Sequence, residues 1–434
     1  MGEQNGRRFR NWGGTLDFRP ASIQYPRTST EVAELVQQAA KAGKKLRVVG
    51  TGHSWTRLVE TPDVLLSLEE LQGVSEIDTE RHTALVLGGS KLQYLGEELR
   101  KHNLALENMG DIDKQSIAGT ISTGTHGTGV NFGVIATQVI ELWLVNGKGE
   151  EVHLTPADGL AFRAAQVALG SLGIVTKLRL QCVPAYNLRC EKRREQLETT
   201  LAKVDEYRMV HRNYEFFWFP YSDLVLNKFL NVTDQTPKHQ PLKKYLTDVV
   251  YENGTFKLLS ETVRLMPKLS KGASKLAASG MAEGKEVLPS HKIYPTERLV
   301  RFYEMEYGVP AAQGPELIRQ IRDRVRQKNI RVHFPIEYRY VKGDNIPLSP
   351  AYGQEMCFIS VHMYKGMDYR PYFQALEPLF MEHGGRPHWG KMHTQTAYYL
   401  QRQYPEWEGF LATREAFDPQ GIFLNDYLRE IFGM

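Results

Sequence analysis

The chain has 434 residues, of which 41% are hydrophobic and 24% charged, which predicts a globular protein of two domains and excludes disorder, a fibrous repeat and a small disulfide scaffold. Its 54 basic and 50 acidic side chains leave a net charge of +4, too small to suggest a nucleic-acid partner. Three cysteines without metal-type spacing, and no uncharged apolar run of 18 residues, lead us to expect a cytoplasmic protein with neither a metal site nor a membrane span.

The pattern of apolar residues and glycines in the first 180 residues predicts alternating helices and strands. Thr28 and Glu31 have the spacing of a capping box, and the apolar stripe after them predicts a helix that ends at Gly43. A short buried strand, Leu46–Val49, follows and runs directly into a glycine-rich turn. The further elements expected in this region are a strand at 84–87, a helix at 92–102, a hairpin at 139–145 and 151–154, a helix at 159–169 and a strand at 174–182.

The composition changes after Val183-Pro184. Residues 191–330 are richer in charged and aromatic side chains, and residues 234–244 predict a loop. Strong alternation near 332–341 and 356–364 predicts antiparallel strands with one covered face.

Two glycine-rich segments are candidates for binding a phosphate-containing ligand. The first, residues 50–54, is not a dinucleotide fingerprint, because Trp55 stands where the third glycine would be. The second, residues 116–129, combines small residues with Ser and Thr hydroxyls, so backbone and side-chain donors can approach a diphosphate closely. A glycine-rich hairpin without a ligand is the alternative. Two such loops, each leaving a buried strand, favour the ligand.

Five segments, in this order, resemble those of the sugar-1,4-lactone oxidase group of the vanillyl-alcohol-oxidase-type flavoproteins, with the alditol oxidases as near relatives. They are residues 47–55, 116–129, 170–176, 386–393 and 417–428. The resemblance implies an α+β fold, with a PCMH-type FAD-binding domain at 1–183, a cap domain of mixed sheet and helix at 184–395, and a C-terminal segment at 396–434 that returns to the FAD domain. It assigns FAD contacts to Val49, Gly50, Thr51, Gly52, His53, Ser54, Gly110, Asp111, Ser116, Gly119, Thr120, Thr123, His126, Gly173, Ile174 and Asn425.

The resemblance also implies a covalent link between His53 and the flavin 8α-methyl carbon, formed when a neutral imidazole nitrogen attacks an electrophilic flavin tautomer. A histidine that only hydrogen-bonds the diphosphate, leaving FAD dissociable, is the alternative. Doubly linked relatives use a cysteine about 60 residues further on. Cys182 is the first cysteine of this chain, so a single link is expected.

Gly110 falls on a position that, in this group, controls the access of oxygen to the flavin. A glycine has no Cβ and leaves room for O2, which favours an oxidase. The alternative is that Gly110 only supplies a turn with positive φ.

The expected catalytic residues are Glu337, Arg339 and Lys391. Glu337 and Arg339 share one face of a strand, and without further context they would be an ordinary surface ion pair. The resemblance makes them a substrate clamp, and it gives Lys391, otherwise a solvated turn charge, the role of orienting the reactive hydroxyl. His362, His388 and His393 are secondary candidates that line the pocket, whereas His126 is expected to serve its own loop.

The implied function is oxidation of a sugar-1,4-lactone of the L-gulono, L-galactono or D-arabinono type, with reoxidation by O2 to give H2O2. Alditol oxidation, a lactone dehydrogenase that uses a cytochrome or quinone, and a non-catalytic sugar- or nucleotide-binding protein remain open. The sequence leaves open the exact sugar, the physiological acceptor, the oligomeric state and the role of residues 191–330.

Overall fold

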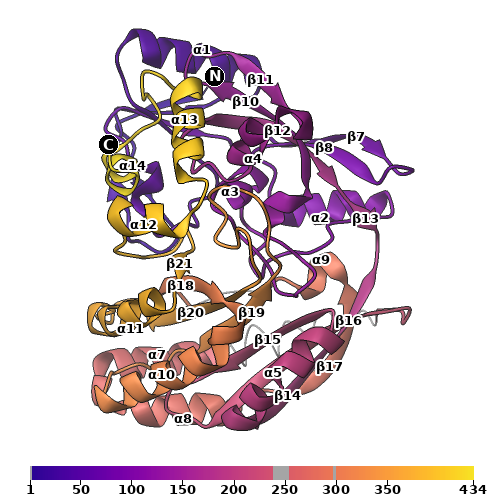
Figure 1. Ribbon diagram of the computed structural model, residues 1–434, viewed down its shortest axis with the longest axis vertical. Helices are drawn as coiled ribbons and strands as arrows, with labels where there is room; N and C mark the ends of the chain where they lie inside the picture. The colour runs from indigo at the N-terminus through magenta and orange to yellow at the C-terminus, as the bar shows by residue number, and fades with distance from the viewer. Residues whose placement is uncertain (1, 238–253, 297–299) are drawn as a thin grey trace.

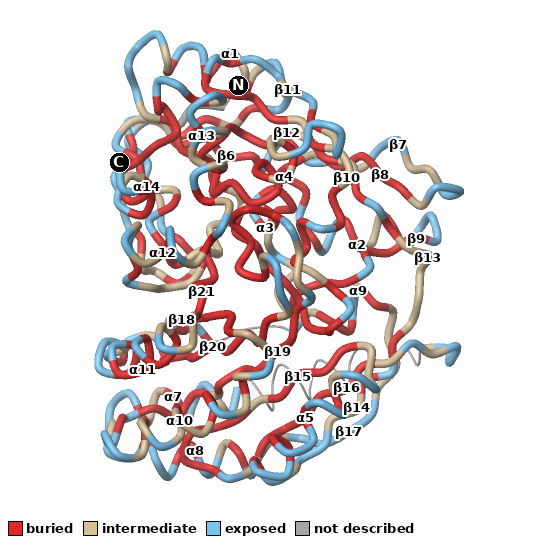
Figure 2. Tube along the Cα trace, in the orientation of Figure 1, coloured by how far each residue is buried: buried red, intermediate tan, exposed pale blue. Residues whose placement is uncertain are grey.

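A computed structural model describes residues 2–237, 254–296 and 300–434, and Figure 1 shows that they form two halves. The upper half contains the first 180 residues with the C-terminal helices beside them, and the lower half is built around one large sheet. Buried segments, red in Figure 2, follow the strands of both halves. Among the described residues, no helix is both long and apolar enough to cross a bilayer.

The upper half contains two main sheets. One has the order β1(Gly2–Asn5), β4(Ser22–Tyr25), β6(Val64–Ser67) and β5(Leu46–Val49), in which β4, β6 and β5 are parallel. The other is antiparallel, with the order β11(Glu151–Leu154), β10(Val139–Asn146), β12(Gly173–Gln181), β8(Thr83–Leu87) and β7(Val74–Asp78). Helices α1(Ser29–Lys41), α2(Leu92–Lys101), α3(Ile117–Ser122) and α4(Leu160–Gln166) and the short strand pairs β2(Phe9–Arg10)–β3(Asp17–Phe18) and β9(Leu104–Ala105)–β13(Val183–Pro184) complete this half.

The lower half has an antiparallel sheet of eight strands. Their order is β17(Gly284–Pro289), β14(Asn187–Gln196), β16(Leu224–Thr233), β15(Asn213–Trp218), β19(Ile336–Val341), β20(Met356–Tyr364), β18(Phe302–Pro310) and β21(Arg386–Pro387). The helices of this half are α5(Leu197–Val210), α7(Gly254–Leu265), α8(Ser270–Gly280), α9(Ser290–Ile293), α10(Gly314–Gln327) and α11(Arg370–Glu382), and the C-terminal helices are α12(Ala397–Gln403), α13(Trp407–Phe417) and α14(Asp426–Phe432).

The two faces of the large sheet differ in polarity. Phe216, Tyr338 and Ile359 lie on the face that packs against helices α5, α10 and α11 in one apolar core. Glu215 and Glu337 are their neighbours along the same strands and therefore point to the opposite face. The alternation of the strands thus sets a row of charged side chains on the face away from these helices.

The structure confirms several predicted elements and corrects two. The Thr28 hydroxyl oxygen accepts from the backbone N–H of Glu31 at 3.1 Å, and Gly43 ends the helix region at φ +63°. The segment 116–129 is not loop throughout, because α3 occupies its first half. The strand expected at 332–341 begins at Ile336, because Pro335 has no N–H to give to a ladder. Of the loop predicted at 234–244, residues 238–244 lie outside the described residues.

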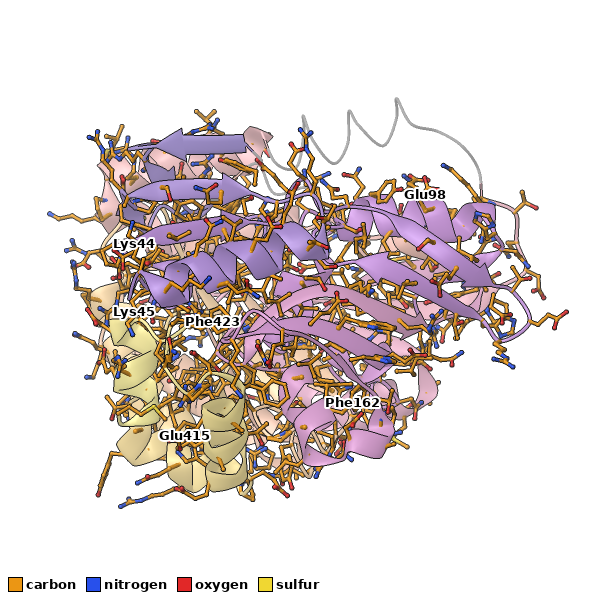
Figure 3. All side chains as sticks on the ribbon, turned by 90° about the horizontal axis from the view of Figure 1, so that it is seen from above. Lys44, Lys45, Glu98, Phe162, Glu415 and Phe423 are labelled. Carbon is orange, nitrogen blue, oxygen red and sulfur yellow. The ribbon has the colours of Figure 1, made fainter. Side chains whose placement is uncertain are left out.

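The C-terminal segment packs onto the first half of the chain. The backbone N–H of Leu46 donates to Ile422 O at 2.9 Å, and that of Gly147 donates to Phe417 O at 2.8 Å. Figure 3 shows the C-terminal helices beside the region that carries Lys45, whose ammonium donates to Gly421 O at 2.8 Å. This segment therefore completes the core of the first half.

Arg47 is the buried centre of this junction. Its guanidinium donates to the carbonyl oxygens of Leu58, Leu169 and Gly170 at 2.6 to 2.8 Å, and also to that of Phe423. Burial lowers the pKa of Arg47 to about 9, although Asp418 raises it. One side chain thus joins its own strand to three other segments, at Leu58, at Leu169–Gly170 and at Phe423.

Replacing Arg47 by Met is expected to lower the free energy of unfolding by about 3 kcal/mol or more, because four buried carbonyls lose a charged donor. Chemical denaturation followed by circular dichroism measures the change. Lys45→Met is the control and should cost about 1 kcal/mol, since it removes one partly exposed hydrogen bond. Equal losses in the two variants would contradict this role of Arg47.

Candidate functional site

A pocket lies in the upper half, at the two glycine-rich segments. Ten of the predicted FAD contacts line it: Val49, Gly50, Thr51, Gly52, His53, Ser54, Ser116, Gly119, Thr123 and Gly173. Asn11, Gln115 and Ser122 also line it and were not predicted. The two turns identified in the sequence therefore meet at one cavity, although 66 positions separate Gly50 from Ser116.

Polar atoms and close backbone approach make this pocket suitable for a diphosphate. Ser116 Oγ is buried and has no hydrogen-bond partner, so it is available to a ligand. A Cβ on Gly50 would lie 2.0 Å from this oxygen, which shows that the backbone of the first turn approaches the second loop closely. These features fit the diphosphate of FAD, which backbone amides and hydroxyls of this kind can hold.

Six further predicted contacts, Gly110, Asp111, Thr120, His126, Ile174 and Asn425, are not among the residues that line this pocket. Thr120 is buried and its hydroxyl donates to Ser116 O at 2.9 Å, and Ile174 belongs to the apolar core. Asn425 donates to Arg57 O and Glu60 O, at 2.8 and 2.9 Å, and so joins the C-terminal segment to the residues that follow the first turn.

His53 lines the pocket and has the properties of a nucleophile. Burial, and secondly the charge of Lys391, lower the pKa of His53 to about 4, so the imidazole is neutral at neutral pH. Its Nδ1 is buried without a hydrogen-bond partner, and its ring stacks on Trp12 with the centroids 5.9 Å apart. A neutral ring with an available nitrogen is the form that attacks an electrophilic carbon.

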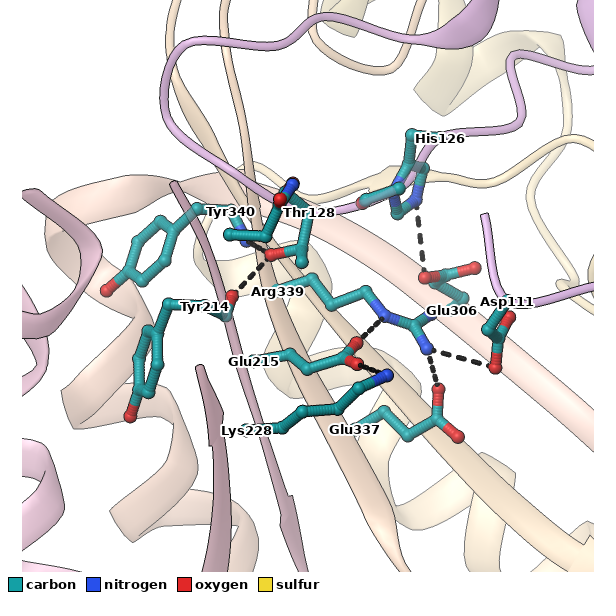
Figure 4. A network of polar contacts seen from close by, with 12 residues as sticks. Asp111, His126, Thr128, Tyr214, Glu215, Lys228, Glu306, Glu337, Arg339 and Tyr340 are labelled. Atoms are coloured by element: carbon teal, nitrogen blue, oxygen red, sulfur yellow. Dashed lines mark hydrogen bonds and ion pairs between the residues drawn. The ribbon is translucent and has the colours of Figure 1, made fainter. Parts of the chain in front are cut away.

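Arg339 is the centre of a buried charge network on the polar face of the large sheet, shown in Figure 4. Its guanidinium contacts Glu337 at 2.5 Å, Glu215 at 2.8 Å and Asp111 at 3.3 Å. Lys228 pairs with Glu215 at 2.8 Å. Glu337 is 3% exposed and Arg339 7%, so the sequence-based alternative of a surface ion pair is wrong.

These charges hold one another in their ionised forms. Burial alone would raise the pKa of Glu215, but Lys228 and Arg339 lower it to about 2. Burial alone would lower the pKa of Arg339, but Glu337, Asp111 and Glu215 raise it. The guanidinium is therefore fixed in position by three carboxylates and remains charged.

A second cluster lies around Glu304, on β18 of the same sheet. Its carboxylate pairs with Lys391, and His362 Nε2 lies 3.5 Å away. Burial would raise the pKa of Glu304, but Lys391 and His362 lower it to about 2. The Lys391 side chain is only 14% exposed and lies 4.5 Å from the Trp55 ring centroid, so it is not a solvated turn charge.

The three secondary histidines lie in different places. His362 lies on the charged face, and its pKa is raised because Glu304 and Glu337 outweigh the effect of burial. His388 follows β21, and burial lowers its pKa to about 3. His393 is directed elsewhere: Nε2 contacts the Tyr427 hydroxyl at 2.9 Å, and Nδ1 accepts from the N–H of Gln395.

Gly110 and Asp111 come just before the second glycine-rich segment in the chain. Gly110 does not have positive φ, so the alternative that it only supplies a left-handed turn is wrong. A Cβ there would lie 3.1 Å from His126 O, a close but not impossible contact. Asp111 contributes to the network around Arg339.

Sequence reasoning missed Glu215, Lys228, Glu304 and Glu306, all of which are buried on the charged face. Glu304 and Glu306 have the same i, i+2 spacing in a strand that identified Glu337 and Arg339, so this signal was present. Glu215 and Lys228 lie opposite each other on paired strands, a relation that only the strand register reveals.

Comparisons with known proteins agree with this geometry. The family model of D-arabinono-1,4-lactone oxidase matches residues 178–431, and that of an FAD binding domain matches residues 20–155. The chain is 39% identical to the L-gulono-1,4-lactone dehydrogenase of Mycobacterium tuberculosis over 423 residues, and 31% identical to the L-gulonolactone oxidase of Scyliorhinus torazame over 440 residues. Each alignment covers 98% of both chains.

Solved structures confirm the fold. The crystal structure of cholesterol oxidase from B. sterolicum matches with a TM-score of 0.86 and 17% identity, and the match covers 99% of this chain and 97% of the other. The expected α+β flavoprotein fold, with an FAD-binding domain and a cap of mixed sheet and helix, is thus confirmed. The family resemblance drawn from the five segments is confirmed as well, and the chain belongs to the D-arabinono-1,4-lactone oxidase family.

Proposed function

We propose that this protein is an FAD-dependent oxidoreductase that oxidises a CH–OH group of a sugar-1,4-lactone of the L-gulono, L-galactono or D-arabinono type. One observation carries the proposal: a buried guanidinium, fixed by three carboxylates, faces the domain that carries the diphosphate-type pocket. The family model and the names of the relatives support the substrate class. We also propose the domain division 1–183, 184–395 and 396–434, and a cytoplasmic location, which the free and buried cysteines support.

Bound FAD supplies the two-electron acceptor for the hydride that leaves the carbinol carbon. Glu337 accepts hydrogen bonds from the sugar hydroxyls and takes the proton of the reacting hydroxyl on a carboxylate oxygen. Arg339 donates from its guanidinium to the same oxygen as carbonyl character develops. Because Glu215 and Asp111 already hold the guanidinium, no reorganisation is needed when the charge shifts.

Lys391 has a separate role in this proposal. Its ammonium is held by Glu304 beside Trp55 and next to the first glycine turn, so it carries a fixed positive charge to the edge of the pocket. There it orients the reactive hydroxyl and offsets the negative charge that accumulates on reduction.

We further propose that His53 is covalently linked to the flavin 8α carbon and that O2 is the electron acceptor. The overall reaction converts the secondary alcohol and O2 into a ketone and H2O2, so two electrons and two protons leave the sugar. Gly110 supports the assignment as an oxidase, because a residue without a Cβ leaves room for O2. A lactone dehydrogenase with another acceptor is the second candidate, since the relative with 39% identity is named a dehydrogenase.

Acid precipitation of the purified protein tests the link to His53. The flavin is expected in the pellet for the native chain and in the supernatant for His53→Ala, because alanine has no nucleophilic nitrogen. His153→Ala, a change at a surface imidazole paired with Glu141, should leave the flavin in the pellet. Yellow supernatant from the native chain would refute a covalent bond.

Replacing Glu337 by Gln tests the catalytic assignment. The rate of anaerobic flavin reduction by L-gulono-1,4-lactone, followed by stopped-flow absorbance, is expected to fall about 100-fold or more, because the amide cannot accept the hydroxyl proton. Glu283→Gln, at an exposed pair with Arg194, is the control and should reduce at the native rate. A native rate in Glu337→Gln would show that the substrate does not react at this face of the sheet.

Replacing Gly110 by Ala separates the oxidase from the dehydrogenase. The added methyl group is expected to slow reoxidation by O2 while reduction of an artificial dye continues, because it narrows the space beside His126 O. Gly272→Ala is the control, since a Cβ there meets open space. If the native protein, once reduced, is not reoxidised by O2, the protein is a dehydrogenase.

A further inference from the structure

Two buried side chains that have no assigned role in the reaction, His126 and Glu306, connect the second glycine-rich segment (residues 116–129, called here the second pocket loop) to the large sheet. His126 Nε2 lies 3.4 Å from Glu306 Oε1, and both side chains are at most 3% exposed. Neither atom has a hydrogen-bond partner. Figure 4 shows the imidazole pointing from its loop towards the carboxylate on the strand beside the Arg339 network.

The hydrogen bonds of His126 determine which ring nitrogen carries a proton. Nδ1 lies 2.8 Å from Gly127 O, and a carbonyl oxygen can only accept, so Nδ1 carries the hydrogen. A neutral His126 would then present the lone pair of Nε2 to a carboxylate oxygen. Two buried acceptors facing each other are unfavourable. Either a proton or a cation must lie between them.

A metal ion at this place is disfavoured by the neighbouring histidine. His126, Glu306 and His388 offer ligand atoms within 4.8 Å of one another, which is the spacing of a candidate metal site. His388 Nδ1, however, accepts from the N–H of Gly390 at 3.0 Å, so Nε2 carries the hydrogen of the neutral ring. Neither nitrogen of His388 has a lone pair left for a metal, and a proton is the remaining choice.

The charge balance of the face also calls for a proton here. Five carboxylates (Asp111, Glu215, Glu304, Glu306 and Glu337) face three permanent cations (Lys228, Arg339 and Lys391). His362 beside Glu304 has a raised pKa and supplies a fourth positive charge when protonated. An imidazolium at His126 would supply the fifth and make the face neutral. Buried charges are tolerated when they are compensated in this way.

We propose that His126 and Glu306 share one proton, carried as an imidazolium on His126, and that this pair positions the second pocket loop on the sheet while it neutralises one carboxylate of the site. The loop is held nearby through Gly129, whose N–H donates to Tyr340 O at 2.7 Å, and through the Thr128 hydroxyl, which donates to Tyr214 O. The ion pair adds an electrostatic contact to these hydrogen bonds. His126 is thus a positioning residue.

Histidine-labelled protein allows a direct test by ¹⁵N NMR at pH 7.5. We expect His126 to show two protonated nitrogens, with its signals assigned by their loss in His126→Gln. In Glu306→Gln the new amide can donate to Nε2, so His126 should become neutral with the hydrogen on Nδ1 while the contact remains. A neutral His126 in the native chain would overturn the proposal. One equivalent of bound metal that is lost in His126→Gln would overturn it in favour of a metal site.

The reduction potential of the bound flavin tests the electrostatic consequence, which rests on the proposed function. His126→Gln leaves the negative charge of Glu306 without its cation, so the reduction potential should become more negative. Glu306→Gln and the double variant should stay near the native value, because each removes one negative and one positive charge together. Equal shifts in both single variants would show a merely structural contact. The NMR result does not depend on turnover, so failure of the lactone assay would leave this proposal standing.

Discussion

The burial of the Arg339 guanidinium is the constraint on which the rest of the site depends. A charge removed from water must be compensated, and here three carboxylates from three parts of the chain provide the compensation: Asp111 precedes the second pocket loop, Glu215 lies on β15, and Glu337 shares the strand of Arg339. The contact with Asp111 joins the sheet to the upper half.

The architecture follows from the two-residue period of the strands. Because side chains alternate between faces, the same strands that supply Phe216 and Tyr338 to the apolar core place Glu215 and Arg339 on the opposite face. The helices cover the first face, so the charged face is the one that meets the FAD-binding half, through the contact between Arg339 and Asp111. Arg47, which lines the pocket, also donates to Phe423 O and so joins the pocket to the C-terminal segment.

The parts of this arrangement that could be predicted from the sequence are those encoded locally. The capped helix after Thr28, the strand before Gly50 and the small-residue composition of residues 116–129 carry their signals within a few positions. Glu337 and Arg339 were identified by spacing together with resemblance. The partners of Arg339 could not be predicted as partners, because Glu215 and Asp111 are over 100 positions away and meet it only through strand pairing and loop docking. The start of β19 was misplaced since the alternation continued through Pro335, where the ladder cannot.

The central claim of the proposed function is that a sugar-lactone binds between the glycine-lined pocket and the charged face of the sheet. A crystal structure of the FAD-bound protein with a non-oxidisable lactone analogue is the most direct measurement of this claim. The account predicts that an analogue hydroxyl oxygen contacts both the Arg339 guanidinium and the Glu337 carboxylate within hydrogen-bond distance. An analogue bound elsewhere, with Arg339 still enclosed by its three carboxylates and inaccessible, would contradict it.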